Sequence, residues 1–164
     1  MSVSEFKPRP VRRVITGHSK DKQAIIAKED VASTVNSRGQ ASSTTVWCVG
    51  SVPAKVEAEG IVVDGATLHP QSGAPANGLR LMVMDLAPGY SGKMHRTNTL
   101  DLVLCLEGEV EMLLPTSAVR LKPGDILVQQ STEHTWTNPG ESPARLAIML
   151  VDAVPLGPGF PAAR

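Results

Sequence analysis

The amino-acid sequence predicts an all-β fold, an antiparallel sandwich or barrel built from short strands. At least six short apolar segments follow one another within about 75 residues, at spacings of roughly 8–12 residues. Glycine and proline together supply 27 of the 164 residues, above the average share, which favours many short elements and turns. No segment sustains a helical periodicity, and this supports the all-β prediction.

The first half of the chain predicts only weak strands, because it is polar and interrupted by Ser/Thr clusters. A single helical turn is expected at 29–32. We expect residues 1–60 to form an N-terminal arm with covering strands that belong to the same domain as the rest. The candidate strands of this half are 12–16, 23–27 and 44–49.

The second half predicts the barrel, over residues 61–153, followed by an irregular tail at 154–164. Gly108 can adopt a positive φ angle and so close a tight hairpin between two strands. Pro123 and Gly124 set the geometry of another turn. The predicted strands of this half are 79–86, 102–106, 110–114, 119–121, 126–128, 134–138 and 145–151.

Composition and charge exclude several classes of protein. Sixteen basic residues balance sixteen acidic ones, which argues against a nucleic-acid binder or a polybasic membrane-surface protein. No apolar run approaches the roughly 18 residues of a membrane span. The first residues lack the apolar stretch of a secretory signal. Cys48 and Cys105 form no CxxC motif, which suits a reducing compartment, so a cytoplasmic location is expected.

The residues that carry chemistry lie between positions 88 and 138. His95 and Thr97 are two apart, so in a strand they face the same side. If the strands line a small barrel, His95, Asp101 and His134 can converge in its interior, and two imidazoles with one carboxylate suit a divalent first-row metal. The neighbours that share these faces, and would form a substrate pocket, are Thr97, Val103, Cys105 and Trp136.

Two segments resemble the conserved motifs of the cupin superfamily. The segment PGYSGKMHRTNTLDLVLCLEGEV, residues 88–110, is similar to the first motif, and GDILVQQSTEHTWTN, residues 124–138, is similar to the second. The short spacer between them fits a small single-domain cupin of the "cupin 2" type. The resemblance implies a jelly-roll barrel, that is, a double-stranded β-helix.

The resemblance also implies a metal site, formed by an incomplete set of ligands. By position, His95 matches the first histidine of the family, Asp101 its glutamate and His134 its last histidine, whereas Thr97 stands at the usual second histidine. The implied cofactor is a divalent metal such as Fe, Mn, Ni or Zn. Gln129 stands where proline is usual, and Ser131 stands where glycine is usual.

Each site residue also has a structural interpretation. The two histidines could be hydrogen-bonded remnants of a lost metal site, and Asp101 could close a turn or pair with Arg96. Cys105 and Trp136 could simply pack in the core.

Three further residues lie outside the two motifs. Arg80 could bind a substrate carboxylate, or it could be a surface charge at a strand end. Surface positions are expected for His18 and His69.

Function is expected in the barrel interior, with a small molecule as substrate or ligand. The first hypothesis is a metal-dependent enzyme that acts on a small organic acid or ring compound by non-oxidative chemistry, such as a decarboxylase, lyase, dehydratase or isomerase. A metal-dependent dioxygenase and a ligand-binding cupin without catalysis are the alternatives. A protein with a dead site remains a third class. We also expect a homodimer in which the N-terminal arm covers a sheet edge or the partner.

Overall fold

The structure is a computed structural model that describes residues 6–56, 58, 65–68 and 73–163. Over these residues the chain forms eleven strands and one short 3₁₀ helix, and every strand pairing is antiparallel. The elements are β1 Arg12–His18, β2 Ala24–Val31, β3 Thr34–Arg38, β4 Ala41–Val49, η1 Gly65–Leu68, β5 Leu79–Leu86, β6 Thr99–Glu107, β7 Val110–Leu113, β8 Ala118–Leu121, β9 Ile126–Gln130, β10 Thr135–Thr137 and β11 Ala144–Asp152.

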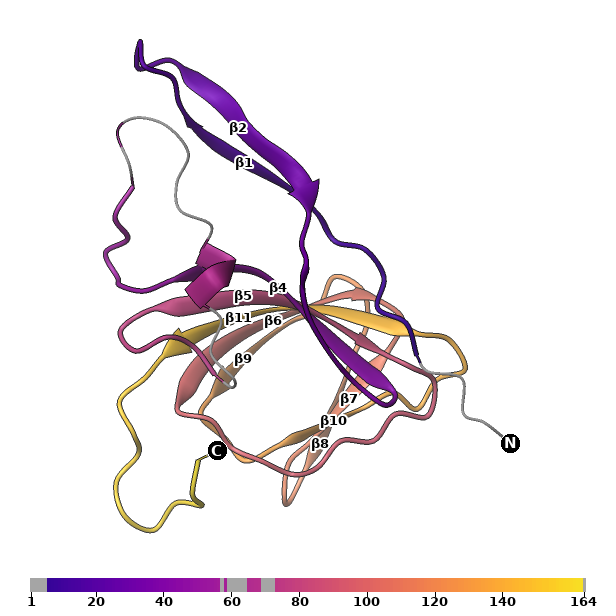
Figure 1. Ribbon diagram of the computed structural model, residues 1–164. Helices are drawn as coiled ribbons and strands as arrows, with labels where there is room; N and C mark the ends of the chain where they lie inside the picture. The colour runs from indigo at the N-terminus through magenta and orange to yellow at the C-terminus, as the bar shows by residue number, and fades with distance from the viewer. Residues whose placement is uncertain (1–5, 57, 59–64, 69–72, 164) are drawn as a thin grey trace.

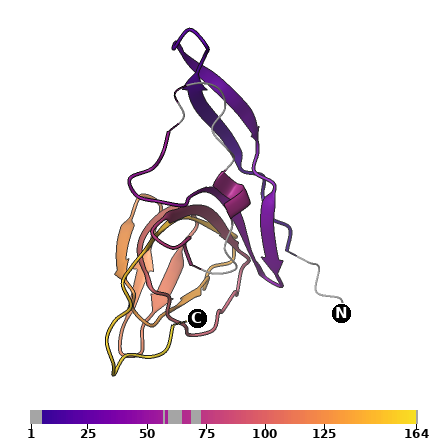
Figure 2. The same cartoon turned by 60° about the vertical axis from the view of Figure 1, so that its left-hand side comes forward.

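Two sheets face each other and enclose the interior of the molecule (Figure 1). The larger sheet has the strand order β3-β4-β5-β11-β6-β9, and the smaller has the order β10-β7-β8. The hairpin β1–β2 is a separate sheet that stands away from both, as the second view also shows (Figure 2). The all-β prediction is therefore confirmed.

Alternating side chains place one face of each central strand inside. Along β6, Asp101, Val103 and Cys105 are buried, whereas Leu100 and Leu104 are exposed on the outer face. This is the two-residue period of a strand with one face toward a core. The core between the sheets is built around the fully buried side chains Leu86, Val103, Val110, Ala144 and Leu146.

Gly108 closes the turn between β6 and β7, as the sequence predicts. Its φ angle is +69°, and a Cβ atom there would lie 2.8 Å from the Pro143 carbonyl oxygen. Both the backbone angle and the close approach of the neighbouring chain require glycine at this position.

The first half of the chain differs from the prediction in two places. The prediction of a helical turn at 29–32 is wrong, because β2 continues to Val31. Glu29 pairs with Val14 across the β1–β2 ladder. Strand β3 was not predicted. It pairs with β4, which in turn pairs with β5, so both strands extend the larger sheet. Ladder pairing outweighs the weak local preference in both places.

The N-terminal segment is fixed to the barrel by a buried carboxylate. Asp85 is 1% exposed and accepts hydrogen bonds from the guanidinium groups of both Arg9 and Arg145. Burial alone would raise the pKa of Asp85, but the hydrogen bonds and charges of Arg145 and Arg9 outweigh burial and lower it.

The chain ends in an irregular segment that also contacts the barrel. Residues 153–163 form no helix or strand, and the carbonyl of Pro161 accepts a hydrogen bond from Arg96. Of the helices in the described ranges, none has the length and apolar character that crossing a membrane requires.

Candidate functional site

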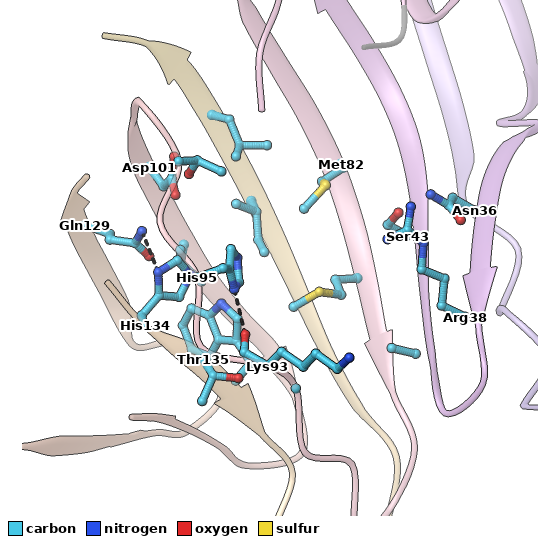
Figure 3. A pocket seen from close by; sticks show the side chains of 18 of the residues that line it. Asn36, Arg38, Ser43, Met82, Lys93, His95, Asp101, Gln129, His134 and Thr135 are labelled. Carbon is cyan, nitrogen blue, oxygen red and sulfur yellow. Dashed lines mark hydrogen bonds between the residues drawn. The ribbon is translucent and has the colours of Figure 1, made fainter. Parts of the chain in front are cut away.

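A cavity of about 720 Å³ lies against the inner face of the larger sheet. Asp101, Gln129, His95 and His134 lie near one another at one end, and Asn36, Arg38 and Ser43 lie at the other (Figure 3). Apolar side chains lie between the Asp101 end and β3, with Met82 at the middle of the same view. The other apolar side chains of the lining, among the described residues, are Ala41, Met84, Val103, Trp136, Ile148 and Leu150.

Two histidines from separate segments meet at the Asp101 end. His95 and His134 form an isolated β-bridge, and the backbone N–H of each donates a hydrogen bond of 2.8 Å to the carbonyl of the other. Their imidazole rings lie with centroids 4.5 Å apart. The backbone, rather than the side chains, therefore sets the distance between the two rings.

Backbone carbonyls also orient both rings. Nδ1 of His95 lies 2.9 Å from the Lys93 oxygen, and Nδ1 of His134 lies 3.0 Å from the Thr132 oxygen. Because a carbonyl oxygen only accepts, each Nδ1 carries the proton and each Nε2 keeps its lone pair. The amide nitrogen of Gln129 lies 3.1 Å from the same nitrogen of His134, but an amide N–H cannot donate to a protonated Nδ1, so in this tautomer the ring is oriented by the Thr132 carbonyl alone.

Burial tunes two of these groups in opposite directions. It raises the pKa of Asp101 to about 6, against a smaller opposing effect of the Thr99 hydroxyl and of His95. It lowers the pKa of His134 to about 4, so this imidazole is neutral at physiological pH. Asp101 is 4% exposed, and its Oδ1 has no hydrogen-bond partner among the described residues. A carboxyl group with this pKa is present in both protonation states near neutral pH.

Comparison with known proteins places this barrel in a family. The model of the cupin domain family matches residues 82–151. The cupin-domain-containing oxidoreductase srdB of Neurospora crassa is 33% identical over 162 residues, covering 94% of this chain and 81% of the relative. The chain belongs to the cupin family.

Two further matches extend over most of the chain. The cupin-domain-containing oxidoreductase fogC of Aspergillus ruber is 29% identical and covers 87% of this chain and 72% of the relative. The cupin domain of Schizosaccharomyces pombe Cnp3 has a TM-score of 0.52 at 12% identity, over 86% of this chain and 87% of the other. This structural likeness supports the fold alone.

The three ligands implied by the cupin resemblance do not come together as one metal centre. Across the described ranges, no three His, Cys, Asp or Glu side chains are arranged so that they could hold one ion. His95 and His134 present two free Nε2 atoms, whereas the Asp101 carboxyl lies apart from them at the same end of the cavity (Figure 3). The residues present therefore fit two protein ligands rather than three.

Most of the predicted pocket residues line the cavity of this cupin, and one does not. Thr97, Val103, Trp136 and Arg80 all line it. Cys105 lies instead in the buried core, where its Sγ is 3.6 Å from the Gly108 carbonyl. It shares the inward face of β6 with Asp101 but lies further along the strand, under the turn.

The interpretation of Arg80 as a surface charge at a strand end is wrong, because Arg80 is only 5% exposed. Arg96 does not pair with Asp101 either. Its guanidinium donates to the Ser131 hydroxyl, the Asn98 side chain and the Pro161 carbonyl.

The structure also bears on the predictions for Asp101 and for the two histidines expected at the surface. Asp101 lies within β6 and faces the cavity, so it closes no turn. His18 is partly buried at the end of β1. His69 lies outside the described residues.

Ser131 shows how the second motif keeps its shape without the usual glycine. Its φ angle is +54°, a conformation that glycine adopts more readily. The Ser131 hydroxyl donates to the Thr97 carbonyl at 2.6 Å and accepts from Arg96. These bonds connect the two motif segments and offset the cost of the backbone angle.

Several lining residues were not predicted as part of the site. Gln129 was noted only as a departure from the family pattern, yet it contacts His134. Asn36, Arg38 and Ser43 come from β3 and β4, which lie outside the two motifs. Only the pairing of β4 with β5 brings them to the cavity.

Proposed function

We propose that this cupin is an enzyme that binds a small organic molecule in the cavity and moves a proton on it. The supporting observation is the convergence of two oriented imidazoles and a buried carboxyl group at one end of a cavity that also has apolar side chains in its wall. An apolar cavity with a few convergent polar groups is the usual form of a small-molecule site. The reaction class is non-oxidative, as in isomerases and lyases.

The polar groups have distinct parts in this proposal. Nε2 of His95 takes a proton from a carbon next to a carbonyl group of the substrate. The electron pair of that C–H bond forms a carbon–carbon double bond, and the carbonyl oxygen receives the proton of Asp101. The product is the enol, which leaves His95 protonated and Asp101 ionised. Neutral His134 accepts a hydrogen bond at Nε2 and holds the substrate in place.

Hydrogen–deuterium exchange tests this step without knowledge of the natural substrate. 5-Oxo-5-phenylpentanoate has an aromatic body and hydrogens next to a ketone that methylene groups separate from its carboxylate, so we use it as the probe in heavy water and follow deuterium uptake by NMR. The intact protein should accelerate uptake over the spontaneous rate, and Asp101→Asn should remove that acceleration. Asp21→Asn, an exposed position far from the cavity in sequence, is the matched control.

A range of oxo acids with smaller and alicyclic bodies should be tested in the same way. Exchange at the spontaneous rate with every one of them would contradict the proposal.

An oxidoreductase is the second candidate, because two relatives that match most of the chain have this word in their names. The two candidates differ in what the reaction consumes. A proton transfer runs equally fast with and without dioxygen and leaves the oxidation state of the substrate unchanged. Oxygen uptake that depends on the probe and is lost in His95→Gln would favour the oxidoreductase instead.

We further propose that the protein is a homodimer. The outer face of β6 and β9 is apolar, and the standing hairpin β1–β2 has exposed apolar side chains as well. A second copy could bury both. The exposed residues concerned are Leu100, Leu104, Ile126 and Val128 on the sheet, and Val14, Ile25, Ile26 and Val31 on the hairpin.

Light scattering tests the dimer directly. Leu104 and Ile126 are register partners, so Leu104→Lys with Ile126→Lys changes one compact patch. This double variant should be monomeric at a concentration at which the unchanged protein is dimeric. Val154→Lys changes an exposed apolar residue of the tail and should leave the dimer intact. A monomeric mass for the unchanged protein at micromolar concentration would contradict the proposal.

A further inference from the structure

Arg80 is a buried cation in the wall of the cavity. It is 5% exposed and lies on β5 with its side chain in the cavity lining. Its Nε donates to the hydroxyl of Thr45 at 3.1 Å, and no carboxylate of the described residues forms an ion pair with it. Burial accordingly lowers the pKa of the guanidinium below its ordinary value. Its hydrogen-bond partner among the described residues is a neutral hydroxyl, and a buried charge without an opposite charge beside it costs stability until one reaches it.

The strand register places Arg80 opposite the Asp101 end of the cavity. Leu150 of β11 pairs with Arg80 of β5 on one side and with Asp101 of β6 on the other. The three residues therefore form one row across the inner face of the sheet. Because neighbouring strands lie about 4.8 Å apart, the backbones of Arg80 and Asp101 are about 10 Å apart. A small molecule lying over Leu150 can contact both side chains.

The charges around the cavity favour an anion. Arg38 and Lys93 also line it, at the edge away from Asp101 (Figure 3). Among the described residues, the lining therefore has three cationic side chains and one carboxyl group, in a chain whose formal net charge is zero. An excess of one sign in a cavity raises the local concentration of the opposite ion.

We propose that Arg80 binds the carboxylate of the substrate, so that the substrates of this cupin are small organic acids with an apolar body. This inference rests on the proposed function and names its substrate class. The planar guanidinium can donate two parallel hydrogen bonds to a carboxylate. The apolar body then lies along Met82 and Leu150, and the end distant from the carboxylate reaches Asp101 and His95.

Calorimetric binding of matched ligand pairs tests the assignment separately from catalysis. The probes are phenylacetate with phenylacetamide, and cyclohexanecarboxylate with cyclohexanecarboxamide, so that only the charge differs within each pair. The unchanged protein should bind each carboxylate more tightly than its amide. Arg80→Gln should weaken carboxylate binding by roughly 10- to 100-fold, as expected for hydrogen bonds to a charged group, and leave the amides unaffected.

Two further variants complete the test. Arg38→Gln makes the same chemical change at an exposed residue of the cavity edge and should weaken carboxylate binding only a few-fold. Arg80→Met removes the charge and keeps an apolar chain of similar length. If Arg80 serves the ligand rather than the fold, the melting temperature of the ligand-free Arg80→Met protein should stay level or rise. A large fall would show a structural role and overturn the inference.

The outcomes separate this inference from the proposed reaction. Equal carboxylate affinity in Arg80→Gln and the unchanged protein, or no preference for the carboxylates over their amides, would overturn the role of Arg80. Carboxylate binding that depends on Arg80, without deuterium exchange on any oxo acid, would uphold that role while the proton-transfer function fails.

Discussion

His95 and His134 are joined by hydrogen bonds between their backbones, so their imidazole side chains remain available to a molecule bound in the cavity. The reciprocal 2.8 Å hydrogen bonds join residues that are far apart in the chain, one from each motif segment. The ring positions thus depend on main-chain pairing and on the carbonyls of Lys93 and Thr132. Changes at either side chain should therefore alter chemistry more than folding.

The first prediction concerns these side chains. His95→Gln should lose most of the catalysed exchange, roughly 100-fold or more, because general acid–base groups contribute about that much. The backbone bridge remains in the variant, so its melting temperature should stay within a few degrees of the unchanged protein. Exchange kinetics and calorimetry measure the two effects. Unfolding of His95→Gln at moderate temperature would show that the ring supports the fold instead.

The second prediction concerns the pH dependence of stability through Asp101. Its pKa of about 6 in the folded protein lies above the usual value of about 3.9. A raised pKa contributes stability that is fully present below the unfolded pKa and is lost as the pH rises through the folded pKa. The Asp101→Asn variant lacks this loss. Its melting temperature, relative to the unchanged protein, should therefore increase between about pH 4 and pH 7.

His134 acts in the opposite direction over the same range, because its folded pKa of about 4 lies below the usual value. Its contribution is present above the unfolded pKa and is lost as the pH falls. His134→Gln should therefore flatten the acid side of the stability profile. A pH-independent difference between either variant and the unchanged protein would contradict the assigned shift for that residue.

The third prediction concerns the carboxylate that fixes the N-terminal segment. Asp85→Asn leaves Arg145 without its buried anionic partner and should lower the free energy of unfolding by about 3–5 kcal/mol. Glu107→Gln is the matched control, since Glu107 is the exposed partner of Arg9 and such pairs contribute about 1 kcal/mol or less. Urea denaturation compares the two. An equal loss in the free energy of unfolding in both variants would show that the burial of Asp85 does not increase its contribution to stability.

The acid side of the same prediction follows from the lowered pKa of Asp85. Stability from this group is complete above the unfolded pKa of about 3.9 and is lost as the pH falls below it toward the folded value. Asp85→Asn should lose less stability than the unchanged protein over that interval.

The fourth prediction concerns metal binding. His95 and His134 offer two ligands, so Zn²⁺ added to the unchanged protein should bind weakly. Thr97 lines the same cavity, and Thr97→His restores the residue that the family motif places there. This variant should bind Zn²⁺ at one equivalent, with at least tenfold higher affinity, because it adds a third ligand. Stoichiometric tight binding by the unchanged protein, measured by plasma mass spectrometry after gel filtration, would contradict the two-ligand arrangement.

The sequence predicts the barrel strands well because local signals agree there. The strand predicted at 79–86 has the same bounds as β5, since an apolar run ends at Pro88-Gly89. The inward face of β6 also follows from alternation alone. By contrast, β3 is an edge strand made of Thr, Val, Asn, Ser and Arg, and only its pairing with β4 identifies it as a strand.

The same limit applies to the site. Spacing within a motif places His95 and Asp101 in the cavity, but the sequence does not encode which residues of different strands lie side by side. The row that joins Arg80, Leu150 and Asp101 is a matter of register, visible only once the strands are paired. Cys105 shows that strand alternation alone is not sufficient. Its side chain is on the inward face of β6, as predicted, but it lies in the core rather than in the cavity.

The row formed by Arg80, Leu150 and Asp101 also sets the length of the molecule that can contact both ends of the row. The separation of β5 and β6 is set by their hydrogen bonds to β11 and cannot adjust to the bound substrate. Acids whose reactive carbon lies too close to the carboxylate would contact Arg80 without reaching Asp101, whereas those of matching length would span both. Discrimination by chain length would then be a property of the backbone, and substitutions of the apolar lining would change affinity without changing the preferred length.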